Sequence, residues 1–207
     1  KWLFDLDYSQ LRKAAADIAR HHVSTYKGVV DVWDSMNEAH DWANCFELNQ
    51  EQLIDLTRAT TDALREANDK ATSIVNICLP FAEYVAGRYN CYGALPEHLR
   101  SPLAYFKAIL EAGVDFDVVG IQLYFPSRDM VAVSKMLDAF AALGKPIHIT
   151  EMGVNGGFRQ KGRCGLPRRT DPGKETKNKC LRKMSPLRQR YSGKYKIFLL
   201  CRLETGL

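Results

Sequence analysis

Short apolar segments alternate with longer helix-forming segments along the first three quarters of this 207-residue chain. The apolar segments are predicted strands, and they lie at 29–33, 72–77, 117–124 and 147–151. The predicted helices lie at 9–22, 50–68, 101–112 and 129–143. Strands that alternate with helices in this way form parallel β/α units. The alternation therefore predicts an α/β fold built on a parallel sheet.

The composition of the chain changes near residue 157. Residues 1–157 carry 14 Lys and Arg against 21 Asp and Glu, whereas residues 158–207 carry 15 against 3. All 20 alanines also lie before residue 158. We therefore expect a folded domain over 1–157 and a basic tail over 158–207 that is disordered or results from a frameshift. A nucleic-acid-binding extension would fit the charge, but the tail holds no recognisable motif, so no nucleic-acid partner is expected.

Two glutamates follow predicted strands, at the positions where a parallel barrel carries its chemistry. Glu38 ends the string Trp-Asp-Ser-Met-Asn-Glu, and Glu151 ends the string Ile-Thr-Glu. Strand alternation places Ile147, Ile149 and Glu151 on one face, so we expect this carboxylate to continue an apolar face into the mouth of the barrel. Two such carboxyls suit the cleavage of an acetal bond, in which one must be neutral while the other is ionised.

These strings resemble glycoside hydrolase family 10, the endo-β-1,4-xylanases. The family's acid/base motif, similar to Trp-Asp-x-x-Asn-Glu, matches residues 33–38. Its nucleophile motif, similar to Ile-Thr-Glu-Leu-Asp, matches residues 149–151, but Met-Gly replaces Leu-Asp at 152–153. A third motif, similar to Gly-Ile-x-x-Gln-x-His or Gly-Ile-Gln-x-His, matches at Gln122 and has Tyr124 in the histidine position.

The resemblance implies a (β/α)8 barrel and a retaining hydrolase of xylan or a related β-1,4-glycan, with Glu38 as acid/base and Glu151 as nucleophile. Tyr124 can donate a hydrogen bond as the histidine does, but a phenol does not titrate near neutrality. His40 follows Glu38 closely and could tune its charge. The expected substrate-binding residues are Asn37 at the sugar 2-hydroxyl, Gln122 and Tyr124 beside the nucleophile, Asn76 on a neighbouring strand, and Trp42 as a wall of the cleft.

No cofactor or metal is expected, because the sequence has no phosphate loop, no Cys/His cluster and no Gly-x-Ser-x-Gly elbow. No membrane partner is expected either, since no apolar run reaches the about 18 residues of a membrane span. The resemblance implies a secreted or periplasmic enzyme, although the first residues lack the apolar stretch of a secretory signal. The oligomeric state stays open.

A complete barrel of this kind usually needs about 250 residues. Between Glu38 and Glu151 the chain advances three β/α units, so strands four to seven of the barrel are expected to be present and the first three absent. Because a four-stranded stub leaves edges and core exposed, we expect little hydrolysis from this chain alone. Two alternatives stay open: another two-glutamate barrel glycosidase that acts on a different sugar, and a truncated product that is inactive or only binds sugar.

Overall fold

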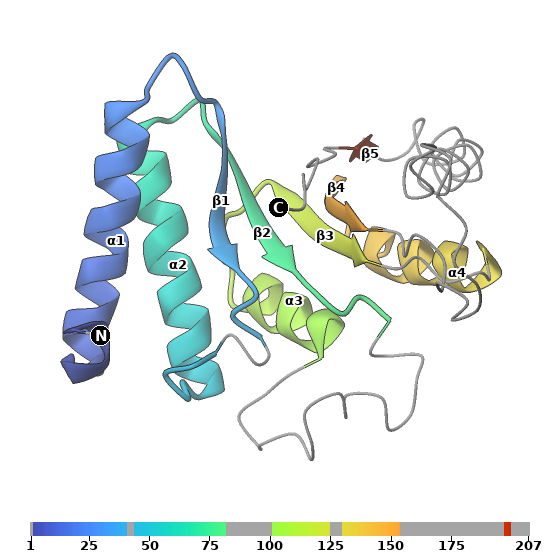
Figure 1. Cartoon of the computed structure of the whole chain (residues 1–207), viewed down its shortest axis with the longest axis horizontal. Helices are drawn as coiled ribbons and strands as arrows, with labels where there is room; N and C mark the ends of the chain where they lie inside the picture. Colours follow the sequence, from blue (N-terminus) through green and yellow to red (C-terminus); the bar gives the residue numbers. More distant parts are fainter. Residues whose placement is uncertain (1, 41–43, 82–100, 125–129, 154–196, 200–207) are drawn as a thin grey trace, which may run out of the picture.

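The computed structural model describes residues 2–40, 44–81, 101–124, 130–153 and 197–199 (Figure 1). The strands of this part form one parallel sheet, in the order β1-β2-β3-β4-β5. The elements are η1 (Trp2–Asp5), α1 (Tyr8–Thr25), β1 (Val32–Asn37), α2 (Gln50–Ala67), β2 (Thr72–Ile77), α3 (Pro102–Glu111), β3 (Val118–Tyr124), α4 (Met130–Ala141), β4 (Ile147–Gly153) and β5 (Ile197–Leu199). The predicted parallel α/β fold is confirmed.

The first strand begins later than the sequence pattern indicated. It was predicted at 29–33, but β1 starts at Val32, and Val29 is 82% exposed. Gly28, with φ of 82°, ends the turn after α1 in the left-handed region that favours glycine. The backbone N–H of Val29 then donates to the carbonyl of Tyr26 at 3.0 Å. The prediction was wrong here because these residues complete a turn, although their side chains are typical of a strand.

The fifth strand was not predicted. β5 extends the sheet beyond β4, with Ile197 opposite Ile147 and Leu199 opposite Ile149. It lies within residues 158–207, where we expected no barrel strand, so that expectation was wrong for these three residues. The edge of β4 offers backbone partners that an apolar run can satisfy by pairing. Residues 154–196 and 200–207 lie outside the described residues, and the domain boundary at 157 stays a prediction.

Side-chain caps fix where the first two long helices begin. The Asp7 carboxylate accepts from the backbone N–H of Gln10 at 2.8 Å, and the Gln10 side chain accepts from the backbone N–H of Asp7 at 3.1 Å. Asn49 and Gln52 form the same reciprocal pair at α2, at 2.9 and 3.0 Å. Each pair satisfies two backbone donors that a helix start otherwise leaves without partners.

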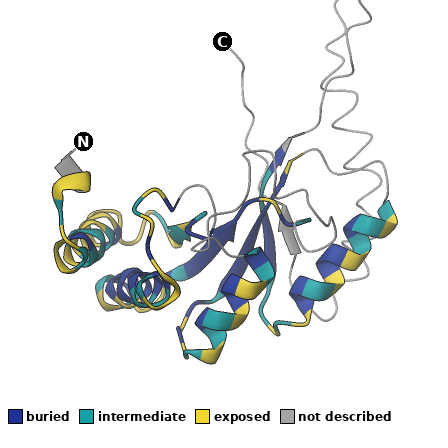
Figure 2. Ribbon diagram, turned by 90° about the horizontal axis from the view of Figure 1, so that it is seen from below, coloured by how far each residue is buried: buried dark blue, intermediate teal, exposed yellow. Residues whose placement is uncertain are grey.

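The helices cover one face of the sheet, and the core lies between the two layers (Figure 2). Aromatic side chains from the helices and loops pack here against branched side chains of the strands. Among the described residues, the apolar side chains with no exposed surface are Val75, Ile77, Phe106, Ile109, Phe116, Val119, Ile121, Leu123, Val133, Met136, Phe140, Ile147 and Ile149. This apolar layer holds the strands in place, and the polar side chains of the strands described below lie on the opposite face of the sheet.

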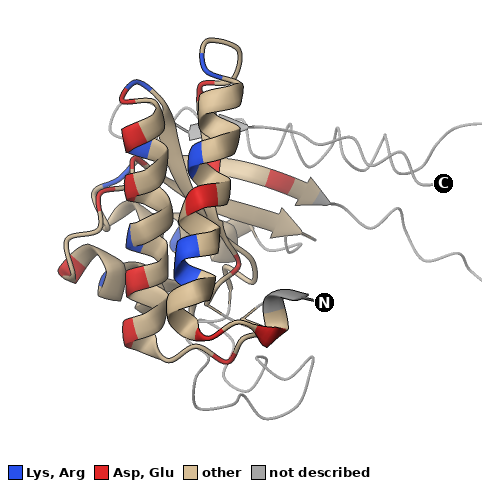
Figure 3. Ribbon diagram, turned by 90° about the vertical axis from the view of Figure 1, so that its left-hand side faces the viewer, with Lys and Arg blue, Asp and Glu red and all other residues tan. Residues whose placement is uncertain are grey.

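Residues of both charges lie along α1 and α2 (Figure 3), and ion pairs between their side chains join the two helices. Arg12 Nε contacts Asp55 Oδ2 at 2.7 Å, and Arg20 Nη2 contacts Glu66 Oε2 at 2.8 Å. The Tyr8 hydroxyl also donates to Asp55, at 2.6 Å. Solvent reaches these groups and screens their charges, so the ion pairs add little to the free energy of folding. Their effect is to orient the two helices that flank β1.

Candidate active site

An irregularity in strand pairing turns Glu151 to the polar face of the sheet. Ile149 is fully buried in the core beneath the helices, and strict alternation would place Glu151 beside it. The pairing shifts between β3 and β4, so that Ile121 lies opposite Ile149 but Gln122 lies opposite Glu151. The extra residue is Thr150, which acts as a β-bulge. The prediction that Glu151 continues the apolar face of the strand was therefore wrong.

A second irregularity, at Ser35, brings Asn37 to the same polar face. Asp34 lies opposite Ile74, and Asn37 lies opposite Asn76, so three steps along β1 match two along β2. The Ser35 hydroxyl donates to the carbonyl of Ile74 at 3.0 Å and secures the extra residue. The predicted substrate-binding residues Asn37 and Asn76 are thereby brought side by side.

Glu38 leaves the end of β1 with a left-handed backbone. Its φ is 55°, and its N–H donates to the carbonyl of Asn76 at 2.9 Å. A residue with a side chain in such a conformation costs about 1–3 kcal/mol, and such strain concentrates at functional sites. The carboxylate accepts from Gln122 Nε2 at 2.5 Å. The strained turn therefore carries the side chain across β2 to β3.

Polar side chains from four neighbouring strands connect the surroundings of the two glutamates. Asn37 Oδ1 accepts from Asn76 Nδ2 at 2.8 Å and from Gln122 Nε2 at 3.2 Å. Asn76 Oδ1 accepts from the Thr150 hydroxyl at 2.7 Å. Asn76 and Gln122 are only 1% and 3% exposed. Thr150 was not among the predicted site residues, although its place directly before Glu151 in the nucleophile motif could have indicated it.

Gly120 provides the room that this network needs. A Cβ atom at this position would lie 2.6 Å from Ile74 Cγ2 and 2.7 Å from Asn76 Oδ1. Since such approaches do not occur between real atoms, Asn76 can lie over β3 only because residue 120 is glycine. The glycine of the third motif thus has a direct steric role in placing Asn76.

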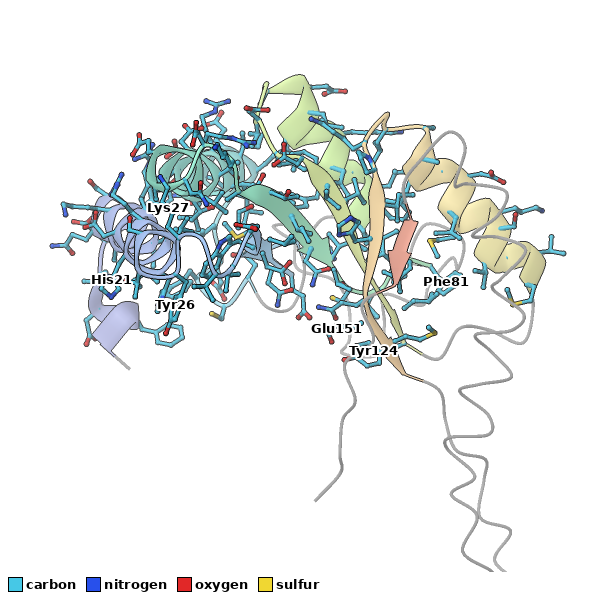
Figure 4. The ribbon with its side chains drawn as sticks, turned by 90° about the horizontal axis from the view of Figure 1, so that it is seen from above. His21, Tyr26, Lys27, Phe81, Tyr124 and Glu151 are labelled. Carbon is cyan, nitrogen blue, oxygen red and sulfur yellow. The ribbon has the colours of Figure 1, made fainter. Side chains whose placement is uncertain are left out.

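Tyr124 and Glu151 meet at one end of the sheet, far from His21 and Lys27 (Figure 4). The Tyr124 hydroxyl donates to Glu151 Oε2. The ring is still 36% exposed, so it lines the open face as well as contacting the carboxylate. Both expected roles of Tyr124, beside the nucleophile and along the cleft, are compatible with this geometry.

Asp34 adds a third carboxyl group to the site. Solvent still reaches it, but the surrounding protein desolvates the carboxyl, and this, together with the negative charge of Glu151, raises the pKa of Asp34 to about 6. In the sequence, Asp34 stands out only as part of the match to the acid/base motif. Its pKa depends on a strand 113 residues further along the chain, so local sequence gives no sign of it.

The histidines near the site carry no charge at neutral pH. His40 is fully buried, stacks on Tyr105 with ring centroids 5.9 Å apart, and burial lowers its pKa to about 3. A neutral His40 adds no positive charge beside Glu38, so the geometry does not support the possibility that it tunes the charge of Glu38. His148, which lies opposite Gly120, is 8% exposed, and burial lowers its pKa as well. Neither imidazole supplies a positive charge to the glutamates.

Two further findings concern the part of the chain that the structure describes. Within it, no group of three or more His, Cys, Asp and Glu side chains is arranged to hold a metal ion. None of its helices combines the length and the apolarity needed to cross a bilayer. The predicted cleft residue Trp42 lies outside the described residues.

The sequence of the chain is similar to those of known endo-1,4-beta-xylanases. The family model of glycosyl hydrolase family 10 matches residues 1–192. Endo-1,4-beta-xylanase A of Caldicellulosiruptor saccharolyticus is 30% identical over 151 residues, which cover 66% of this chain and 40% of that protein. Endo-1,4-beta-xylanase B of Thermotoga neapolitana is 27% identical over 166 residues, which cover 73% and 42%. The chain thus spans about two fifths of the length of these relatives.

Solved structures extend the likeness to the fold. A xylanase from Thermobacillus composti superposes with a TM-score of 0.67 at 20% identity, over 97% of this chain and 59% of that one. Xylanase XynB from Paenibacillus barcinonensis superposes with a TM-score of 0.67 at 15% identity, over 95% and 57%. Both matches cover most of this chain but little more than half of a barrel enzyme, as the partial (β/α)8 barrel predicted from the sequence requires.

Proposed function

The chain belongs to glycosyl hydrolase family 10, and from this membership we propose that the protein cleaves internal β-1,4 bonds of xylan with retention of configuration. Glu38 is the proposed acid/base and Glu151 the proposed nucleophile. One observation carries the assignment: both glutamates converge on Gln122, which donates to Glu38 and lies opposite Glu151 on the next strand. The relatives named endo-1,4-beta-xylanase support the choice of xylan as substrate.

The contact between Gln122 and Glu38 supports the acid role. An amide nitrogen can only donate, so Glu38 Oε1 acts as an acceptor whether the carboxyl is ionised or protonated. When Glu38 is protonated, its proton is therefore kept on Oε2. The proton is then available to the leaving oxygen of the glycosidic bond.

The contact between Tyr124 and Glu151 supports the nucleophile role. The Tyr124 hydroxyl holds one oxygen of the Glu151 carboxylate in place, and a carboxylate held in this way can attack the sugar carbon. Because the bond is made to Oε2, the other oxygen is left for attack. In a retaining reaction Glu151 forms a covalent glycosyl intermediate, and water activated by Glu38 then releases the product.

The remaining predicted site residues have proposed places around this pair. Asn37 would bind the 2-hydroxyl of the sugar at the cleavage site, with Asn76 holding it from β2. Trp42 keeps its proposed role as a wall of the cleft. Since a xylan chain is too large to enter a cell intact, we also propose that the protein acts outside the cytoplasm, as a secreted or periplasmic enzyme.

Substitution of the two glutamates in the full-length protein tests the proposal. Glu38→Gln should lower turnover of xylan by about 10²–10⁴-fold, because the leaving oxygen no longer receives a proton. A 2,4-dinitrophenyl xylobioside needs no such proton, so its kcat/KM, which reports cleavage up to the covalent intermediate, should be largely kept. Glu151→Gln should abolish both reactions, since no covalent intermediate can form. Glu111→Gln, at the exposed end of α3, is the matched control.

Two results would count against the assignment. If Glu38→Gln loses equal activity on both substrates, Glu38 is not the acid. A first product with inverted configuration, followed by proton NMR, would remove the retaining mechanism. Faster turnover of aryl cellobiosides than of aryl xylobiosides would favour the alternative of a two-glutamate glycosidase with another sugar, and sugar binding without turnover would favour an inactive remnant.

A further inference from the structure

A chain of hydrogen bonds leads from Glu38 to Thr150. The contact with Glu38 fixes which atom donates and which accepts at each step of this chain. Gln122 contacts an oxygen of Glu38, and the ionised carboxylate only accepts, so in this state the atom of Gln122 at the contact must be its amide nitrogen. The same nitrogen also contacts the side chain of Asn37 at 3.2 Å. The Asn37 atom at that contact must therefore be the amide oxygen.

The same reasoning determines the donor and the acceptor in the next two contacts. The amide oxygen of Asn37 also contacts Asn76 at 2.8 Å, so the Asn76 atom there must be its nitrogen. The oxygen of Asn76 then contacts Thr150 at 2.7 Å, and since an amide oxygen only accepts, the Thr150 hydroxyl must donate. Asn76 is only 1% exposed, so water cannot substitute for a partner that turns away.

We propose that Thr150 is a positioning residue that acts through Asn76 to hold the amide nitrogen of Asn37 towards the substrate. Asn37 Oδ1 already accepts two hydrogen bonds, which use both of its lone pairs. Asn37 is exposed on the open face, and only its nitrogen is left to bind there. The site therefore presents a donor, which suits an oxygen acceptor such as a sugar 2-hydroxyl. The last step rests on the proposed function, whereas the direction of the bonds does not.

Two isosteric substitutions test the direction without measuring activity. Asn37→Asp keeps an oxygen facing Asn76 and Gln122 and changes only the group on the open side, so the Tm should stay within about 2 °C of wild type. Asn76→Asp places an oxygen against Asn37 Oδ1, so the Tm should fall by about 5 °C or more. Each variant adds one negative charge to the same network, so repulsion between charges affects both. Measuring the Tm in about 0.5 M NaCl screens this repulsion. Equal decreases in Tm, or a larger decrease for Asn37→Asp, would overturn the proposed direction of the hydrogen bonds.

A substrate pair tests the positioning role of Thr150. The wild type should prefer an aryl β-xylobioside to the analogue that lacks the 2-hydroxyl at the cleavage site. Thr150→Val removes the donor, and the ratio of kcat/KM values should fall about fivefold to tenfold because Asn76 and Asn37 are free to rotate. Thr150→Ser keeps the donor and should stay within about twofold of the wild-type ratio. Thr72→Val, at the opposite end of β2, is the control for losing a threonine from the sheet.

The outcomes separate this proposal from the proposed function. A wild type that cleaves neither substrate contradicts the proposed function, while the two Asp variants still decide the direction of the bonds. A wild type that cleaves both, with an unchanged ratio in Thr150→Val, overturns the positioning role of Thr150. Should Thr150→Val fail to fold, a ratio in Thr150→Ser that falls as far as fivefold overturns it as well.

Discussion

Tyr124 donates a hydrogen bond to Glu151, and its Cα lies opposite Gly153 on the neighbouring strand. These positions, 124 and 153, are two of those at which the sequence departs from the motifs of family 10, which have a histidine and an aspartate there. The two departures therefore face each other across β3 and β4. A phenol stays a donor over a wide pH range without an acidic partner, so the two changes are chemically consistent with each other.

The hydroxyl of Tyr124 is expected to support catalysis through its hydrogen bond to Glu151. Tyr124→Phe removes this donor, so kcat/KM should fall about tenfold across the pH profile. Tyr124→His restores a donor but adds a group that titrates near about pH 6.5, so a further inflection should appear there. Tyr26→Phe, on the turn after α1, is the control. A profile of Tyr124→Phe that overlays the wild type would contradict this role.

Asp34 is expected to make the protein less stable as the pH rises. Its pKa is raised from 3.8 to about 6, so between these values the folded state binds more protons than the unfolded state, and stability falls across this window. Asp34→Asn should therefore stabilise the protein at about pH 7 by about 1 kcal/mol, less than the full shift would give because solvent reaches the group. At about pH 3.5 most of the gain should vanish. Urea unfolding at both pH values is the measurement, and equal gains would contradict the prediction.

Gly120 is expected to tolerate no side chain. Gly120→Ala places a methyl group against Ile74 and Asn76, and such overpacking costs about 1–3 kcal/mol. Because Asn76 must move, activity should also fall at temperatures where the variant is folded. Gly144→Ala is the control, since its φ is 78° but no atom lies within 4 Å of the added methyl. It should lose stability without losing activity, and equal losses of activity in both variants would remove the special role of Gly120.

Limited proteolysis tests the predicted domain boundary. The 15 Lys and Arg of residues 158–207 offer many trypsin sites, so cleavage should rapidly leave a core that ends near residue 157. If the pairing of β5 with β4 persists in solution, a fragment that contains residues 197–199 should stay associated with that core on gel filtration. A tail that resists trypsin throughout would contradict the boundary.

The sequence by itself determined the kinds of elements, their order and the positions of the motifs. β2 spans Thr72–Ile77 as predicted, and α2 differs from its predicted range only at its last residue. These features are local. Apolar periodicity sets helix or strand within a few residues, and caps such as Asn49 with Gln52 set a helix start within one turn. The same local pattern placed Glu38 after a strand and Glu151 late in one, although β1 and β4 end later than predicted.

Only the tertiary structure decided which way the site residues face. Alternation along β4 predicted that Glu151 shares a face with Ile149, but the extra residue at Thr150 reversed it. The burial of His40 and the pKa of Asp34 likewise depend on strands and helices far away in the chain. The physical reason is that the register of a strand is fixed by its neighbours. A single unpaired residue exchanges the two faces for every residue beyond it, and no local pattern records the exchange.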